Sequence, residues 1–130
     1  MSVTLESDHV TFAPDHILNE WGDMARKIGE ATGRSFTTAM GHTMRDRIEQ
    51  AGFVDVVETK IKVPCNTWPK DPVLKQAGLL MESMLDQSIE GMATMLYTQV
   101  LKWDLKDVLM FTARARAEMK KKSNCPYLPV

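Results

Sequence analysis

Two polar side chains inside a long apolar segment are the first residues whose type could support chemistry. The segment GLLMESMLDQSIEGMATMLYTQVL runs from Gly78 to Leu101, and it contains Tyr97 and Gln99. A polar group among apolar neighbours must find a hydrogen-bond partner or face a cavity. We therefore expect both side chains to be polar groups of a pocket, Gln99 as a substrate contact and Tyr97 as a catalytic candidate.

A histidine near the N-terminus is the second catalytic candidate. Asp15-His16 precedes an apolar helical face, and His16 has the chemistry to donate a hydrogen bond to a carbonyl or to transfer a proton. An equally good interpretation is structural, with Asp15 as the N-cap and His16 in the first helical turn. The other two histidines, His9 and His42, are expected to be ordinary loop or surface residues.

Other catalytic signatures are missing from the sequence. The three histidines have no metal-ligand spacing and there is no HExxH motif, so we expect no bound metal. No Ser-His-Asp or Cys-His arrangement has a recognisable local signature. Cys65 and Cys125 match neither a zinc nor a redox spacing, and both are expected to be reduced thiols.

A stripe of methionines surrounds the polar candidates on the long segment. Its members recur at three- and four-residue spacings, with Ser88 among them, and so share one helical face: Met81, Met84, Met92 and Met95. Methionine fills irregular gaps, so the stripe favours a plain core but can also form the adaptable wall of an apolar ligand pocket. A second apolar stripe adjoins it, which predicts a helix covered on most sides by the remaining segments.

The rest of the chain supplies the elements that must cover this helix. Further helices are predicted from Asp15 to Thr32 with Gly33 as the stop, from an N-cap at Thr38 to Ala51, from Pro72 to Ala77, and after an N-cap at Asp104. Strands are predicted over residues 2–7 and, most strongly, over 53–63, followed by a proline-bounded loop and later by an extended C-terminal tail. The fold class expected is α+β and mainly α-helical, with about four to five helices around the Met-rich helix and two or three short strands.

Composition limits the remaining possibilities. The chain has 130 residues, 44% of them hydrophobic and 25% charged, which fits a single domain over residues 1–130. Its 16 basic and 17 acidic residues are well mixed, so we expect no nucleic-acid or membrane partner. Neither a signal peptide nor a transmembrane run is visible, and a cytoplasmic protein is expected.

Three stretches of the sequence resemble a known family. They are SDHVTFAPDHILNEW from Ser7 to Trp21, TGRSFTTA from Thr32 to Ala39, and AGFVDVVETKIKVPCNTWPKDPVLKQAG from Ala51 to Gly78; the closing PYLPV fits as well. The chain resembles the fungal class I S-adenosylmethionine-dependent methyltransferases of the LaeA-like or TAM-domain kind. The resemblance implies the C-terminal, substrate-capping half of such an enzyme, with short strands left from its sheet, and His16 in its PDH motif.

The sequence departs from that family in one respect. A cofactor site of this class needs a Gly-rich turn after the first strand and an acidic residue at the end of the second. Neither is present, since the seven glycines are scattered without a GxGxG spacing. We therefore expect no cofactor and no methyl transfer, and we interpret the chain as a naturally truncated protein.

The resemblance also implies what is retained. The capping half holds the substrate, which makes the expected substrate-binding residues Trp21, Met24, Trp68, Met81, Met84, Ser88, Met92, Met95, Gln99 and Trp103, beside the catalytic candidates His16 and Tyr97. An apolar pocket with few polar groups suits a cyclisation, isomerisation or cycloaddition. We expect a cofactor-free cyclase or pericyclase-like enzyme that binds a small apolar polyene or terpenoid in fungal specialised metabolism.

Two further expectations concern partners. A remnant of a larger sheet should have bare edges, and a symmetric homodimer would cover them. Two alternatives to an enzyme are open: a non-catalytic binding or regulatory partner of a full-length methyltransferase, and a non-functional fragment.

Overall fold

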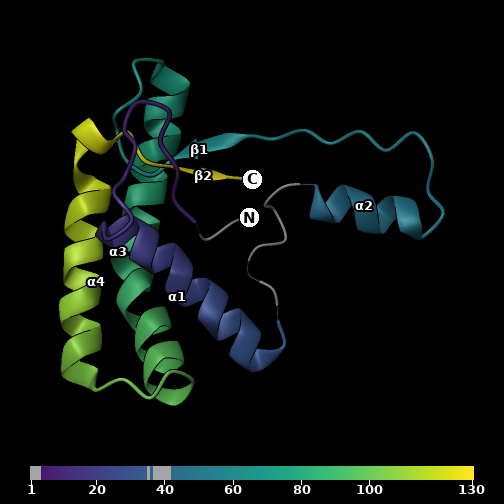
Figure 1. Ribbon diagram of the computed structural model, residues 1–130. Helices are drawn as coiled ribbons and strands as arrows, with labels where there is room; N and C mark the ends of the chain where they lie inside the picture. Colours follow the sequence, from purple (N-terminus) through teal and green to yellow (C-terminus); the bar gives the residue numbers. More distant parts are fainter. Residues whose placement is uncertain (1–3, 35, 37–41) are drawn as a thin grey trace.

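The computed structural model describes residues 4–34, 36 and 42–130. The described residues form four α-helices, one short 3-10 helix and a two-stranded sheet (Figure 1). In chain order they are α1 (Ile17–Thr32), α2 (Thr43–Gln50), β1 (Lys62–Pro64), α3 (Pro72–Gln99), α4 (Leu105–Lys120), η1 (Lys122–Asn124) and β2 (Tyr127–Pro129). The expected mainly helical α+β class is confirmed. No helix in this described part is both long and apolar enough to cross a membrane.

Helix α1 begins one residue later than the capping interpretation required. His16, and not Asp15, is the N-cap, and its Nδ1 accepts a hydrogen bond of 3.3 Å from the backbone N–H of Leu18. At the other end Gly33 has a φ of 67°, the left-handed geometry that ends many helices. The predicted stop at Gly33 is confirmed.

Helix α3 is one unbroken element, so the predicted division at Gly78 is wrong. It begins at Pro72, where Asp71 caps it by accepting from the N–H groups of Val73 and Leu74, both at 2.9 Å. Gly78 does not break the helix; it allows the helix to pack closely against a neighbouring segment. A Cβ added there would lie 2.1 Å from the backbone oxygen of Asn66, which follows β1.

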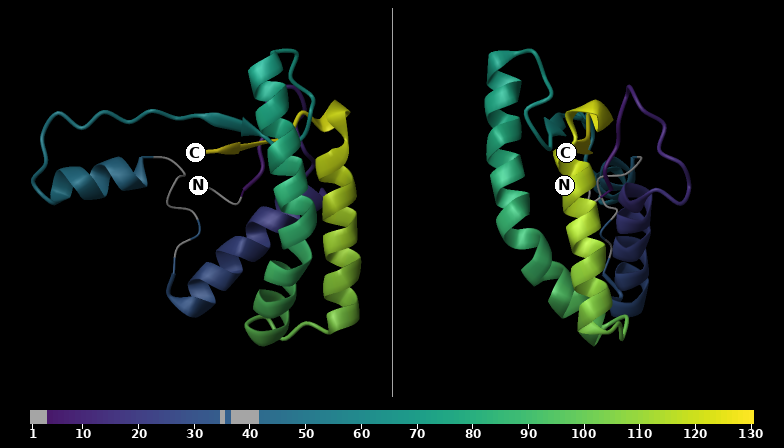
Figure 2. Two further views of the ribbon diagram at one scale, coloured as in Figure 1. Left: turned by 180° about the vertical axis from the view of Figure 1, so that it is seen from behind. Right: turned by 90° about the vertical axis from the view of Figure 1, so that its left-hand side faces the viewer.

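The prediction that this helix is covered on most sides is also wrong. Helix α3 packs against α4 and β1, and α4 lies beside both α3 and α1 (Figure 2). The buried residues of α3 are only Gly78, Ile89, Ala93 and Tyr97. The opposite side carries exposed apolar side chains, which we call the open face of α3: Leu80, Met84, Met92 and Met95, exposed by 67, 44, 46 and 54%.

Helix α4 provides the second wall of the core. The helical period predicts that Leu105, Val108, Leu109, Thr112 and Met119 face inward. Val108, Thr112 and Met119 are buried, but Leu105 and Leu109 are exposed by 52 and 38%; Asp104 is the N-cap residue. Arg116 and Lys120 reach Asp86 on α3 at 3.2 and 2.9 Å. Asp86 is therefore paired with two cationic side chains of α4 across the interface between the two helices.

The strongest predicted strand is much shorter than residues 53–63. Strand β1 pairs antiparallel with β2, with Val63 opposite Leu128, and Glu6 forms a single bridge to Tyr127 on the far edge of β2. Residues 53–61 run out from the body toward α2 as an extended connection (Figure 1). A strand signal cannot form a ladder where no neighbouring strand is present.

The remaining predicted elements can be compared with the structure only where their residues are described. Ser2 and Val3 of the first predicted strand, and the N-cap predicted at Thr38, lie outside the described residues. Helix α2 begins at Thr43, and all of its side chains are exposed. The predicted extended C-terminal tail contains the end of η1 and then β2, which pairs with β1. Both cysteines are free, as predicted, and burial raises the pKa of Cys65 to about 12.

Candidate functional site

A cluster of four aromatic rings joins three helices. Trp21 comes from α1, Tyr97 from α3, Phe111 from α4, and Trp103 from the connection between α3 and α4. Ring centroids lie 5.5 Å apart for Tyr97 and Trp103, 5.6 Å for Tyr97 and Phe111, and 6.2 Å for Trp21 and Phe111. Such offset and edge contacts are favourable for aromatic pairs. This aromatic cluster is the rigid part of the candidate site.

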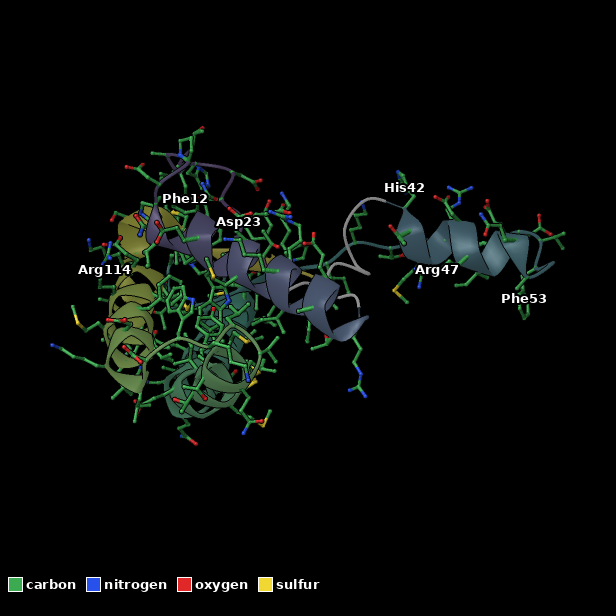
Figure 3. All side chains as sticks on the ribbon, turned by 60° about the horizontal axis from the view of Figure 1, so that its bottom comes forward. Phe12, Asp23, His42, Arg47, Phe53 and Arg114 are labelled. Atoms are coloured by element: carbon green, nitrogen blue, oxygen red, sulfur yellow. The ribbon has the colours of Figure 1, made fainter. Side chains whose placement is uncertain are left out.

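A groove lies along one side of the cluster, between α1 and α4. We call it the α1–α4 groove; it is open to solvent and has a volume of about 560 Å³. Its apolar lining is Pro14, Met24, Trp103, Met110 and Phe111, and its charged lining is Glu20, Asp23, Lys27, Asp107 and Arg114. Figure 3 shows Asp23 on α1 and Arg114 on α4, the two helices that border it. The volume lies in the range of small-molecule sites, but half of the lining residues are charged, so the groove is more polar than most such sites.

A much smaller apolar cavity lies on the other side of the cluster, between α1 and α3. It holds about 40 Å³ and is lined by Trp21, Ala25, Ile28, Phe36, Met92, Ala93, Leu96 and Tyr97. Three of the expected site residues, Trp21, Met92 and Tyr97, therefore meet here. A cavity of this volume accommodates little more than one water-sized group.

Tyr97 is almost fully buried, with 3% of its surface exposed. Burial raises the pKa of its hydroxyl well above the ordinary tyrosine value. The group is therefore neutral at physiological pH and can donate a proton in a hydrogen bond but not act as a phenolate. No hydrogen bond joins this hydroxyl to another residue of the part that the structure describes.

His16 lies at a different hollow. Its ring stacks on Phe12 at 4.7 Å, and its Nε2 lies 3.6 Å from Oε2 of Glu118. Since Nδ1 accepts the capping hydrogen bond, Nε2 carries the proton in the neutral ring and faces the Glu118 carboxylate. The hollow at His16 has a volume of about 380 Å³, and Arg114 lines both this hollow and the α1–α4 groove.

The structure brings the expected site residues together only in part. Met24 and Trp103 line the α1–α4 groove, beside the three that line the small cavity. Trp68 is distant from them in the fold, since its Nε1 donates to the Pro126 carbonyl at 3.0 Å beside the strands. The others occupy α3: Met81 is half-buried, Met84, Met95 and Gln99 are exposed, and Ser88 donates to the Met84 carbonyl of its own helix at 2.7 Å.

Helix α4 contributes groove residues that the sequence reasoning missed. Phe111 closes the aromatic cluster, and Arg114 connects the two hollows. The available signal was the eight-residue step from Trp103 to Phe111, which places both on one side of a helix and its preceding turn.

Glu118 makes the stability of this region depend on pH. Hydrogen bonds from Lys121 and Asn124, and the nearby His16, hold the pKa of Glu118 below the ordinary glutamate value of 4.5. A depressed folded-state pKa contributes stability that is present above the unfolded value and is lost as the pH falls through the folded value.

We therefore expect the stability difference between the wild type and Glu118→Gln to be present above the ordinary glutamate value of 4.5 and to shrink steadily as the pH falls below it. Urea unfolding at a series of pH values measures this difference. Lys121→Ala, which removes the largest cause of the depressed pKa, should reduce the same pH dependence. A difference that grows as the pH falls would contradict this reasoning.

The cofactor implied by the resemblance does not fit the described residues. Apart from Gly41, which lies outside the described residues, the glycines lie in helices or just after them: Gly22, Gly29, Gly33, Gly52, Gly78 and Gly91. None of these six forms a turn after a strand that could receive the amino-acid part of S-adenosylmethionine. No step of the reaction proposed below passes through that cofactor.

Several fungal proteins are similar to this chain. "Secondary metabolism regulator LAE1" of Cochliobolus heterostrophus is 36% identical over 99 residues, which are 75% of this chain and 31% of the relative. "Methyltransferase pytC" of Aspergillus terreus is 31% identical over 119 residues, 87% of this chain and 36% of the relative. "Probable methyltransferase tdiE" of Emericella nidulans is 25% identical over 130 residues, all of this chain and 40% of the relative.

These matches confirm the resemblance and show its extent. The chain spans about a third of the length of the curated relatives it matches. No family model matches the chain, and no solved structure matches it.

Proposed function

Because this chain belongs with the fungal LaeA-like methyltransferase proteins, over about a third of their length, we propose that it acts in fungal specialised metabolism as a cofactor-independent cyclase or isomerase. Its substrate in this proposal is a small apolar molecule, a polyene or terpenoid. The relatives named as a regulator of secondary metabolism and as methyltransferases support the metabolic setting, and the chemistry is proposed from the site.

The α1–α4 groove is the observation on which the proposal depends. Its aromatic floor of Trp103 and Phe111 offers an apolar surface, and its volume of about 560 Å³ suits a ligand of drug-like size. A pericyclic or cyclisation step needs the reacting ends of one molecule to be held close together. The aromatic floor offers one apolar wall against which such a molecule can fold, without a bound group.

The two catalytic candidates have distinct roles in this proposal. An elongated molecule that lies along α4 passes from the groove to the hollow at His16, since Arg114 lines both. There the Nε2 proton of His16, next to Glu118, donates to a carbonyl of the substrate. Tyr97 supports the aromatic floor from below and offers a neutral hydroxyl to a buried polar atom.

Substitution of His16 separates catalysis from helix capping. We expect His16→Asn to lower the rate of product formation about 100-fold, the lower end of general acid–base effects. Asparagine is a good N-cap, so the stability of α1 should be preserved in this variant, whereas His16→Ala should also cost about 1 kcal/mol of stability. Tyr97→Phe should likewise slow the reaction with little change in stability.

The experiment is a metabolite profile of the producing strain with this gene deleted and then complemented by each variant. The proposal expects one product to vanish while an isomer of equal mass accumulates, and the His16→Asn strain to resemble the deletion. If wild-type levels of the product return with both His16→Asn and Tyr97→Phe, the assigned roles are wrong.

A second candidate function is favoured by a different observation. The open face of α3 and the exposed connection before β1 are large apolar surfaces for a chain of this size. They suit a non-catalytic partner that occupies the capping position on a longer methyltransferase. In the same deletion experiment this function predicts that many unrelated metabolites fall together, with no isomer accumulating.

With either function, the open face of α3 and the connection before β1 remain exposed apolar surfaces. We propose that a second copy of the chain buries them. A symmetric homodimer is the most common closed assembly and places the same patch of both copies in contact.

A further inference from the structure

The open edge of the sheet continues into an exposed and extended segment. Phe53, Val54, Val57 and Ile61 in this region are exposed by 66, 83, 87 and 57%. Ile61 exchanges both backbone hydrogen bonds with Val130, donating at 2.8 Å and accepting at 2.9 Å. Neither Glu58 nor Lys60 makes a backbone hydrogen bond with a described residue. The segment therefore has strand-forming side chains and a strand edge that pairs with none of the residues that the structure describes.

The pairing of Ile61 determines the direction in which the backbone N–H and C=O groups of Glu58 and Lys60 point. In an antiparallel strand the N–H and C=O of one residue point to the same edge, and the next residue points to the other. Since Ile61 points to β2, the backbone groups of Glu58 and Lys60 point to the opposite, open edge. An additional strand at that edge would form its hydrogen-bonded pairs at these two residues.

Two copies of residues 57–61 have complementary side chains when they pair as antiparallel strands with the two Thr59 residues opposite each other. In this register Glu58 lies opposite Lys60 of the second copy, and Val57 lies opposite Ile61. Each cross-strand pair is then favourable, because the charges are opposite on one face and both side chains are apolar on the other. Shifting the centre to Glu58 or to Lys60 places two like charges opposite each other.

We propose that a second copy of this chain pairs with the open edge through residues 57–61, antiparallel about a two-fold axis at Thr59. This inference rests on the homodimer in the proposed function and specifies its interface. The Glu58 carboxylate also lies within hydrogen-bond distance, 2.6 Å, of Nδ1 of His42. A carboxylate has enough lone pairs to keep that contact and bind Lys60 of the other copy as well.

The first experiment measures the mass of the purified chain by analytical ultracentrifugation over a concentration series. We expect a dimer whose dissociation constant rises about tenfold or more in Lys60→Glu, since like charges then face each other twice. The doubly exchanged variant Glu58→Lys with Lys60→Glu restores the opposite charges and should restore the dimer. Lys75→Glu, the same charge change on an exposed residue of α3, is the matched control and should leave the dissociation constant unchanged.

The second experiment tests the two-fold position by cross-linking in a Cys125→Ser background. Directly opposite residues at a non-hydrogen-bonded pair have Cα atoms about 4.5 Å apart, which is within disulfide range. Thr59→Cys should therefore form a covalent dimer on mild oxidation. Val57→Cys, about 13 Å from its own copy in this register, should not.

A monomeric wild type at all concentrations overturns this inference, and so does a dimer that is insensitive to Lys60→Glu, is not rescued by the double exchange, or does not cross-link at Thr59→Cys. These measurements need no substrate. A dimer that behaves as expected together with an unaltered metabolite profile after gene deletion would therefore reject the proposed function alone.

Discussion

Replacing Gly78 with alanine should lower the free energy of unfolding by about 3 kcal/mol or more, an effect at the upper end of those seen for overpacked interiors. The added Cβ would lie 2.1 Å from the backbone oxygen of Asn66 and 2.8 Å from its backbone carbon. Backbone atoms cannot rotate aside as the end of a long side chain can. Relief therefore requires α3 to move away from the segment that follows β1.

A matched control lies on the same helix. Gly91 has open space around its position, so Gly91→Ala should stabilise the chain by about 1 kcal/mol through helix propensity alone. The two variants make the same chemical change in α3 with opposite expected signs, and urea unfolding measures both. Equal effects in the two variants would show that α3 does not approach the chain at Asn66 as closely as described.

Truncation of Asn66 is the second large effect expected. Its side chain is fully buried, with Nδ2 donating to the Met119 carbonyl at 2.7 Å and Oδ1 accepting from the N–H of Trp68 at 2.9 Å. These bonds connect the segment after β1 to the end of α4. Asn66→Ala leaves the buried Met119 carbonyl and the half-buried Trp68 N–H without these partners, and since an unpaired buried group costs about 1–3 kcal/mol, we expect a loss of about 3 kcal/mol.

The matched comparison is Asn19→Ala. Asn19 also donates to two backbone carbonyls, those of Phe12 and Ala13 at 3.2 and 2.8 Å, but it is only half-buried. Water can replace its bonds, so the loss should be nearer 1 kcal/mol. Chemical denaturation of both variants, compared at constant m-value, tests the difference. If Asn66→Ala is no more destabilising than Asn19→Ala, Asn66 is not the buried connection described above.

Sequence patterns predicted helix ends correctly where the end depends only on residues that are adjacent in the sequence. Gly33 stops α1 because a left-handed residue needs no partner elsewhere in the chain. Asp104 marks the start of α4 for a similarly local reason. His16 is a mixed case, since capping was correctly weighed against chemistry but assigned to the residue before it.

Features that depend on distant partners were not predictable in the same way. The strand pattern of residues 53–63 is real, but only its last residues have β2 beside them. Gly78 reads as a helix break because the sequence does not show that Asn66 passes over it. The methionine stripe predicts burial, yet no segment among the described residues buries Met84, Met92 or Met95 on the open face of α3.

The candidate site was predictable in its residue types and less so in its arrangement. Trp21, Tyr97 and Trp103 were expected together, and they do share one aromatic cluster. The groove itself depends on how α1 crosses α4, which no periodicity specifies. Phe111 and Arg114 were missed for that reason, and the assigned site roles stay predictions.

The aromatic cluster also gives the molecule an optical signal of its own. The indole rings of Trp21 and Trp103 contact the rings of Tyr97 and Phe111, so their fluorescence depends on the aromatic cluster. The indole of Trp68 instead donates a hydrogen bond beside the strands. A chromophoric polyene that binds at Trp103 would quench the emission of the nearby tryptophans by energy transfer. Titration of a Trp68→Phe variant would thus report occupancy of the groove without a label, before any product is known.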